Sequence, residues 1–111
     1  MQRLDQFTFH ATLAAQSGPA LVGFFAQGCG ACRHWRQLLN EHEAAADALP
    51  LFEVDAGEDP ALTQEFAVFH LPALFLFVDG EYHRPLHCVA DHAALRAALA
   101  TALSRPAEEA P

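Results

Sequence analysis

The sequence has few basic residues and no long apolar run. The first absence argues against a nucleic-acid-binding protein, and the second against a protein that spans a membrane. No run approaches the roughly 20 apolar residues that cross a bilayer, and the first twenty residues lack the basic start and apolar stretch of a secretory signal. Six Lys and Arg residues face fourteen Asp and Glu residues, which gives a formal charge of −8. Such a balance repels nucleic acid and anionic lipid. We therefore expect a cytoplasmic protein that binds neither nucleic acid nor a membrane.

Cysteine is also scarce, with three residues in 111. The cytosol keeps most thiols reduced, so a structural disulfide framework is not expected there. An odd count leaves at least one thiol outside any intramolecular pair. The chemistry of these cysteines therefore depends on their positions in the fold.

The chain itself is long enough for one domain with one core, and 52% of its residues are apolar. We find no internal repeat and no linker. We expect a single domain over residues 1–103 and a flexible C-terminal tail over residues 104–111, which holds two prolines and two glutamates.

The first half of the sequence alternates helical and strand patterns. These patterns predict a helix over 5–16, a strand over 20–26, a helix from Gly30 to Pro50 and a strand over 51–55. The long helix should bury one apolar stripe, formed by Trp35, Leu38, Leu39, His42, Ala45, Ala46 and Leu49. Strand, helix and strand form a βαβ unit, whose two strands should run parallel.

The second half predicts a short helix, a hairpin and a final helix. The segments are a helix from Asp59 and Pro60 to about 67, strands over 73–78 and 81–89, and a helix after Asp91 with Leu95, Leu99 and Leu103 on one face. Asp79 and Gly80 form the hairpin turn, so the two strands should be antiparallel. Counting back from this turn places Leu71 opposite Cys88.

The pair Cys29 and Cys32 lies where the first βαβ strand ends and its helix begins. Unpaired backbone N–H groups and the positive end of the helix dipole favour a thiolate there. Arg33 and Arg36 follow in the same turn and should lower the pKa of Cys29 further. A thiolate attacks disulfides, and a second cysteine three positions on can resolve the mixed disulfide. The motif therefore predicts thiol–disulfide exchange.

Three segments resemble the thioredoxin family: LVGFFAQGCGACRHW, FEVD and FAVFHLPALFLFVDGEY. The resemblance covers residues 20–103 and implies an α/β fold, a central mixed sheet flanked by helices. It also implies reduction of protein disulfides with electrons from a reductase, and no cofactor beyond the cysteine pair. In this family Cys29 is the exposed nucleophile, Cys32 the buried resolver and the bond before Pro72 is cis.

The resemblance also implies a set of substrate contacts near the cysteine pair. The backbone of Leu71 pairs with the substrate chain in this family. We expect the substrate-binding residues to be Gly30, Ala31, Leu71, Pro72 and Cys88. We expect Arg33, His34 and His70 to shift the pKa of a cysteine thiol. His34 lies next to the cysteine motif, and His70 lies next to Pro72.

The sequence departs from the thioredoxin pattern at several positions. Gly23 stands where these proteins carry a buried Asp, and Leu51 where they carry a Lys. Gly28 replaces the tryptophan before the first cysteine, Ala31 the proline inside the motif and Gln37 the proline of the helix. We also expect the first strand to be short or missing.

Two other functions remain open. The chain can be a redox-poor binding or chaperone-like module, because it lacks the Asp and the Lys that thioredoxins carry at the positions of Gly23 and Leu51. It can also bind a metal through Cys29, Cys32, Cys88 and His87, which are soft ligands for zinc or a cluster. For Cys88 we weigh packing against a redox role, and we expect a monomer, with a Cys88-linked dimer as the alternative.

Overall fold

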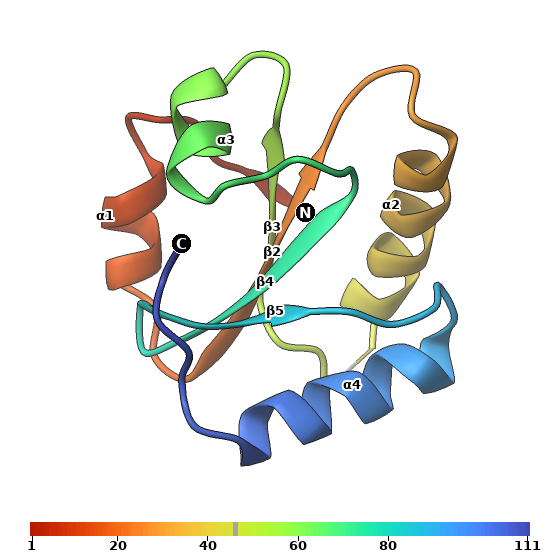
Figure 1. Ribbon diagram of the computed structural model, residues 1–111. Helices are drawn as coiled ribbons and strands as arrows, with labels where there is room; N and C mark the ends of the chain where they lie inside the picture. Colours follow the sequence, from red (N-terminus) through yellow and green to blue (C-terminus); the bar gives the residue numbers. More distant parts are fainter. Residues whose placement is uncertain (46) are drawn as a thin grey trace.

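A five-stranded sheet lies between two pairs of helices in the computed structural model, which describes residues 1–45 and 47–111 (Figure 1). The strand order is β1-β3-β2-β4-β5. The elements are β1 (Gln2–Arg3), α1 (Phe9–Ala14), β2 (Pro19–Phe25), α2 (Gly30–Glu43), β3 (Leu51–Asp55), α3 (Pro60–Glu65), β4 (Ala73–Val78), β5 (Glu81–Leu86) and α4 (His92–Ser104). The α/β class and the mixed sheet are therefore confirmed.

Strand β2 is the centre of the sheet and sets its mixed character. It runs parallel to β3, as the βαβ pattern predicts, and antiparallel to β4. Six of its seven residues are buried, since helices cover both faces. Strand β1 has only two residues, as expected, and pairs with β3 at the sheet edge.

The two faces of the sheet carry separate cores. Helices α1 and α3 cover one face, and α2 and α4 cover the other (Figure 1). The first face is rich in aromatic side chains, including Phe9, Phe24, Phe66, Phe75 and Phe77. The second face is mainly aliphatic and also holds Phe25, Cys32 and Trp35.

Helix α1 is shorter than its sequence pattern predicts. It begins at Phe9, because Asp5 organises a turn before it instead of capping it directly. The Asp5 carboxylate accepts hydrogen bonds from the backbone N–H groups of Phe7 at 2.8 Å and Thr8 at 3.0 Å. These bonds, with the Thr8 hydroxyl, keep the pKa of Asp5 below its usual value.

Helix α2 also ends earlier than predicted, at Glu43 rather than beside Pro50. The backbone N–H groups of Ala44 and Ala45 donate to the carbonyls of Glu41 and His42 at 3.3 and 3.0 Å, so the chain turns more tightly there and the α-helix ends. Of the predicted stripe, Ala45 and Leu49 therefore lie beyond the helix, and Ala46 lies outside the described residues.

The helices α3 and α4 differ from their predictions in detail. Helix α3 ends at Glu65, and Ala67 has a positive φ of 51°, which no helix continues. Helix α4 begins after Asp91, whose side chain accepts from the Ala94 N–H at 2.7 Å. Its buried face ends in Ala102, whereas Leu103 is 42% exposed. The helical period of 3.6 residues places the third buried position there.

A bulge in β5 changes the register that the sequence predicts. Val78 pairs with Glu81 as expected, but the register shifts between Leu76 and Phe77, so that Leu74 faces Leu86. Strand β5 ends at Leu86, so the predicted pairing of Leu71 with Cys88 is wrong. An extra residue in one strand cannot be seen by counting from the turn.

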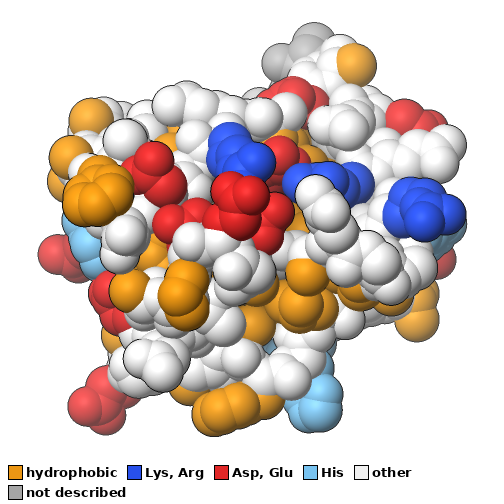
Figure 2. Space-filling model, turned by 90° about the horizontal axis from the view of Figure 1, so that it is seen from above, with side chains coloured by type: hydrophobic (Ala, Val, Ile, Leu, Met, Phe, Trp, Pro, Cys, Tyr) orange, Lys and Arg blue, Asp and Glu red, His pale blue; other side chains and the backbone are white. Residues whose placement is uncertain are grey.

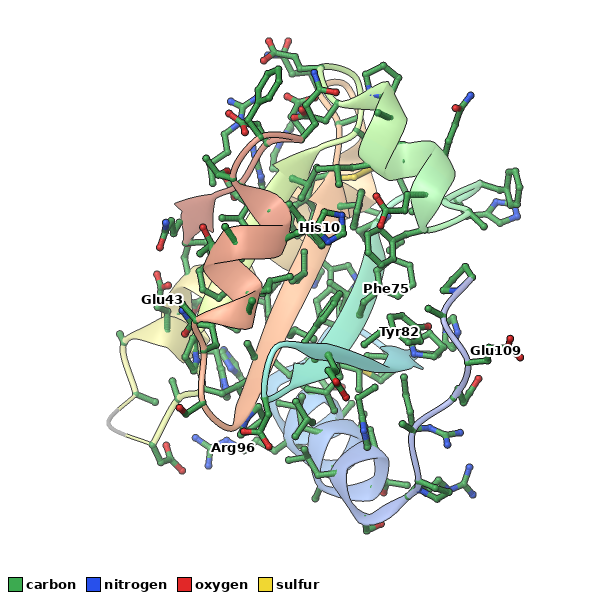
Figure 3. All side chains as sticks on the ribbon, turned by 90° about the vertical axis from the view of Figure 1, so that its left-hand side faces the viewer. His10, Glu43, Phe75, Tyr82, Arg96 and Glu109 are labelled. Carbon is green, nitrogen blue, oxygen red and sulfur yellow. A yellow bond between two sulfur atoms is a disulfide. The ribbon has the colours of Figure 1, made fainter. Side chains whose placement is uncertain are left out.

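The segment after α4 folds back along β5. The Glu108 N–H donates to the His83 carbonyl at 2.7 Å, and Arg84 donates to the Pro106 carbonyl at 2.9 Å. Arg84 also forms an ion pair with Glu108 at 2.6 Å. The tail passes beside Tyr82 and Phe75 (Figure 3). Residues after α4 thus contact β5 in this structure, and the flexibility of residues 104–111 remains a prediction.

Candidate active site

The cysteine pair lies at the upper end of the sheet in Figure 1, between β2 and α2. Cys29 is the N-cap of α2, and its Sγ accepts a hydrogen bond from the Cys32 N–H at 3.1 Å. This N–H is one of the helix-terminal donors that has no partner within the helix. The same donor can stabilise a negative charge on Sγ when the pair is reduced.

Cys29 and Cys32 form a disulfide, with their Cα atoms 5.2 Å apart. The two sulfurs have unequal surroundings. Cys29 is half-buried, whereas Cys32 is 2% exposed and belongs to the core cluster with Trp35. A disulfide partner can therefore approach Cys29 but not Cys32 without movement of the protein.

The loop before β4 forms a second side of the site. The Leu71–Pro72 peptide bond is cis, as the resemblance implies. The Leu71 carbonyl oxygen lies 3.9 Å from Cys29 Sγ, although the two residues are 42 positions apart in sequence. The structure therefore brings together Cys29, Cys32 and Leu71, which were selected from separate parts of the sequence.

A cavity of about 250 Å³ opens directly beside both cysteines. We call it the cysteine cavity, and it is lined by residues 26–29, Cys32, Arg33 and Arg36. Arg36 Nη2 donates to Glu53 Oε1 at 3.3 Å, and its guanidinium carbon lies 5.4 Å from the centre of the Phe25 ring. Arg33 is exposed. Figure 2 shows basic and acidic side chains close together on this upper face.

The space beside Gly23 is filled by an aromatic ring. A Cβ atom on Gly23 would lie 2.5 Å from two carbons of the Phe25 ring and 3.2 Å from a Leu74 methyl group. The Phe25 side chain, 1% exposed, therefore occupies the position that a buried carboxyl would need.

The predicted tuning histidines lie in two different places. His34 Nε2 donates to the Ala90 carbonyl at 3.1 Å, so His34 links α2 to the loop before α4. His70 is exposed and lines a larger cavity of about 540 Å³, together with Pro72 and His87. That cavity is on the Phe66, Tyr82 and tail side of the sheet. Tuning of a thiol by either histidine remains a prediction.

Cys88 lies in the loop between β5 and α4 and has a free thiol. It packs against the same core cluster as Cys29 and Leu71. Burial, followed by the charge of Asp91, raises the pKa of the Cys88 thiol above its usual value. At neutral pH this thiol is therefore protonated and a weak nucleophile.

The alternative metal site, which would use Cys29, Cys32, Cys88 and His87, is not formed by the described residues. Within residues 1–45 and 47–111, no three His, Cys, Asp or Glu side chains are grouped as metal ligands. Helices long and apolar enough to span a bilayer are likewise missing from the part of the chain that the structure describes.

Sequence reasoning missed Phe25 and Glu53. Phe25 is two positions after Gly23 in β2, so both residues face α2, and a large residue beside a glycine on one face was the available signal. Glu53 is the one carboxylate between the apolar residues of β3, and it shares the face of Leu51. A charged residue inside a covered strand was the available signal for it.

The comparisons with known proteins agree with this geometry. The sequence profile of the thioredoxin family matches residues 1–101, and the chain belongs to this family. It is 38% identical to a thioredoxin of Alicyclobacillus acidocaldarius over 63 residues, which are 56% of this chain and 60% of that protein. It is 32% identical to a thioredoxin of Chlamydia muridarum over 81 residues, 73% of this chain and 78% of that protein.

Similarity extends to larger proteins. The chain is 41% identical to the protein disulfide isomerase-like 1-3 of Arabidopsis thaliana over 69 residues, 59% of this chain but only 11% of that protein. For the two relatives from Alicyclobacillus and Arabidopsis, the chain thus spans less than two thirds of their length. The chain therefore carries a cysteine pair of the thioredoxin family, Cys29 and Cys32, joined as a disulfide.

Proposed function

We propose that this chain reduces disulfide bonds in protein substrates by reversible exchange at Cys29 and Cys32. The observation that supports this most directly is the unequal exposure of the two sulfurs at the N-terminus of α2. The accessible Cys29 attacks a substrate disulfide and forms a mixed disulfide, releasing one substrate thiolate. Cys32 then attacks Cys29 and releases the second substrate thiolate.

The contacts proposed for the substrate surround this reaction. Gly30 and Ala31 are exposed in the first turn of α2, and the backbone of Leu71 next to Pro72 would pair with the substrate chain. Cys88 would line the same rim. Phe69, which is 86% exposed and two residues before Leu71, supplies apolar surface for a substrate near this loop.

The reducing direction implies a supply of electrons. A reductase would return the Cys29–Cys32 disulfide to the dithiol after each turnover, and a cytoplasmic location would match this direction, since the cytosolic thiol pool is reducing. Measuring the reduction potential of the pair tests the direction. We expect a value below about −260 mV, the lower end of extracted cytosolic glutathione potentials, and a value above about −220 mV would indicate an oxidant or isomerase.

The test of activity is reduction of insulin by dithiothreitol with and without the protein. We expect the protein to accelerate precipitation of the insulin B chain, and the Cys29→Ser variant to give only the uncatalysed rate. An equal rate with and without the intact protein would contradict the proposal.

A binding module is the second candidate, and the Phe25 ring beside Gly23 favours it. No carboxyl group can share that position to take the proton of Cys32. Resolution of mixed disulfides would then be slow, and partner chains would stay bound at the Pro72 loop. Full binding of a partner protein by a Cys29→Ser, Cys32→Ser double variant, combined with negligible insulin reduction by the intact chain, would select this function.

A further inference from the structure

Gly28, the residue before Cys29, is part of the lining of the cysteine cavity. Gly28 has a φ of 75° and no side chain, and a Cβ atom built there would have no neighbour within 4 Å. This cavity of about 250 Å³ has both cysteines in its lining. A group attached to a disulfide under attack by Cys29 can therefore enter it.

The cavity has a guanidinium group that is held in position. Arg36 lies over the Phe25 ring and donates to Glu53 on β3, so its half-exposed side chain has contacts on two sides. The Phe25 ring can lie beneath it because Gly23 leaves the space free. The missing side chain at Gly23 thus leaves room for the Phe25 ring, and the ring in turn lies beneath Arg36.

The second guanidinium belongs to Arg33, one residue after Cys32. Arg33 is exposed and has no ion-pair partner among residues 1–45 and 47–111, whereas Arg3 and Arg84 are paired with acidic side chains. The whole chain has six basic residues and a formal charge of −8. Two of these six line the cavity that contains both cysteines.

Resting on the proposed oxidoreductase function, we propose that the cysteine cavity selects disulfides that carry a carboxylate close to the sulfur under attack. Guanidinium groups recognise carboxylates through paired N–H donors. The source can be a small acidic disulfide or an acidic residue next to a substrate cysteine. In both cases the carboxylate lies between Arg33 and Arg36 while the sulfur reaches Cys29.

The reductant in this reaction is the dithiol form of Cys29 and Cys32. The Cys29 thiolate attacks the sulfur nearest the carboxylate, forms the mixed disulfide and releases the distal thiolate. Cys32 gives its proton to water and attacks Cys29, which forms the Cys29–Cys32 disulfide and releases the carboxylate-bearing thiolate. The two electrons of the dithiol end on the two released thiolates, which take up protons according to the pH.

The overall charge of the protein predicts the opposite selectivity. A chain with a formal charge of −8 attracts cations and repels anions at long range. A preference for anionic disulfides would therefore arise from the cysteine cavity and would oppose the effect of the net charge. The sign of the selectivity alone distinguishes the two cases.

The experiment uses the reduced, full-length protein and three small disulfides of similar size. These are 3,3′-dithiodipropionate (anionic), bis(2-hydroxyethyl) disulfide (neutral) and cystamine (cationic). Oxidation of the protein is stopped with acid and quantified by mass spectrometry, and each rate is divided by that of a small neutral thiol with the same disulfide. We expect the anionic disulfide to exceed the neutral one by about fivefold, as two solvent-exposed ion pairs allow.

Charge variants assign the preference to the cavity. We expect Arg33→Gln and Arg36→Gln each to lower the anionic-to-neutral ratio by about two- to threefold. Glu53→Gln should raise it, because a carboxylate that competes for Arg36 is removed. Arg105→Gln, an exposed change after α4, should leave it unchanged. A ratio is insensitive to a general change in the reactivity of Cys29, which affects all three disulfides alike.

Two further measurements complete the test. The preference in the unaltered protein should fall as the ionic strength rises from about 0.02 M to about 0.5 M. Disulfide-linked peptides with Glu or Gln beside the cysteine distinguish the sources. A preference shared by peptides and small molecules means that any nearby carboxylate is recognised, and one confined to small molecules identifies those as the substrates.

The possible failures are distinct. Suppose that all three disulfides oxidise the protein faster than they oxidise the reference thiol. The proposed selectivity is then wrong if the anionic disulfide reacts no faster than the neutral one, or if it keeps its higher rate in both arginine variants. If no small disulfide oxidises the protein faster than it oxidises the reference thiol while insulin reduction is still accelerated, the proposed selectivity is also wrong. If insulin reduction is not accelerated either, the oxidoreductase function itself fails.

Discussion

The two faces of the sheet serve different purposes, although both are built from alternate residues of the same central strand. Val22 and Phe24 of β2 contribute to the aromatic core under α1 and α3. Leu21 and Phe25 face the opposite core, which contains Cys32. Among the described residues, the aromatic core contains no cysteine, whereas the other core contains Cys32 and also Phe25, over whose ring Arg36 lies. Stability and chemistry are thus separated across one strand.

The aromatic face should show the largest effect of a single substitution on stability. Phe24 is fully buried, and its ring contacts Phe66 and Phe75 at centroid distances of 5.9 and 5.6 Å. We expect Phe24→Ala to lower the free energy of unfolding by about 3–5 kcal/mol, measured by urea denaturation. Disulfide exchange by the folded fraction should be unchanged. A loss below about 1 kcal/mol, or a change in exchange, would remove the separation of the two faces.

A smaller loss of stability is expected at Gly23, on the reactive face. Gly23→Ala places a Cβ atom 2.5 Å from the buried Phe25 ring, so the ring must shift. We expect a loss of about 1–3 kcal/mol in the free energy of unfolding. Gly30→Ala is the matched control, because a Cβ atom there has no neighbour within 4 Å. Equal losses in the two variants would show that Phe25 does not fill the space beside Gly23.

His42 allows a third test, at the far end of α2. Its ring is 7% exposed, and neither ring nitrogen has a hydrogen-bond partner in the described part of the chain. Burial first, and then the charge of Arg96, lower the pKa of His42 in the folded protein. The unfolded chain therefore binds this proton first as the pH falls below about 6.5, and folding stability is lost from that pH downward.

We expect His42→Leu to stabilise the protein by about 1 kcal/mol at neutral pH, because unpaired buried polar groups are removed. The slope of stability against pH below about pH 6.5 should also become smaller. Urea denaturation at several pH values measures both. An unchanged slope would mean that His42 keeps its ordinary pKa in the fold.

Cys88 should give the smallest effect of all. Because burial raises the pKa of its thiol, we expect Cys88 to be alkylated more slowly than Cys29 in the reduced protein at pH 7. Because serine is close to cysteine in size and would line the rim in the same way, Cys88→Ser should leave the rate of insulin reduction unchanged. A Cys88-linked dimer in the oxidised protein, or slower exchange in the variant, would assign Cys88 a redox role.

Much of the fold is readable from local sequence. Strands β3 and β4 match their predicted bounds, because Leu51 and Ala73 open short apolar segments bounded by prolines and by acidic or glycine turns. The position of the cysteine pair at the start of α2 also follows from local pattern. The ends of α1 and α2 were less predictable, since they depend on the Asp5 turn and on the tighter turns at Ala44 and Ala45.

The parts of the site that the sequence does not predict depend on long-range contacts. The bulge in β5 moves every residue after it by one position relative to β4. The position of Cys88 could therefore not be found by counting residues from the hairpin turn. The stacking of Arg36 on Phe25 requires α2 to lie across β2, and its pairing with Glu53 requires the register of β3. Side chains from three elements meet there, and no spacing along the chain indicates it.

The most direct test of the whole account is to trap the mixed disulfide. Incubation of a disulfide-containing protein such as insulin with the Cys32→Ser variant should give a stable covalent complex through Cys29, since the resolving sulfur is gone. The Cys29→Ser variant is the control and should give none, because Cys32 is 2% exposed. Mass spectrometry of the non-reduced digest identifies the linked cysteine. A complex through Cys32 or Cys88, or none in either variant, would contradict the assignment of Cys29 as the nucleophile.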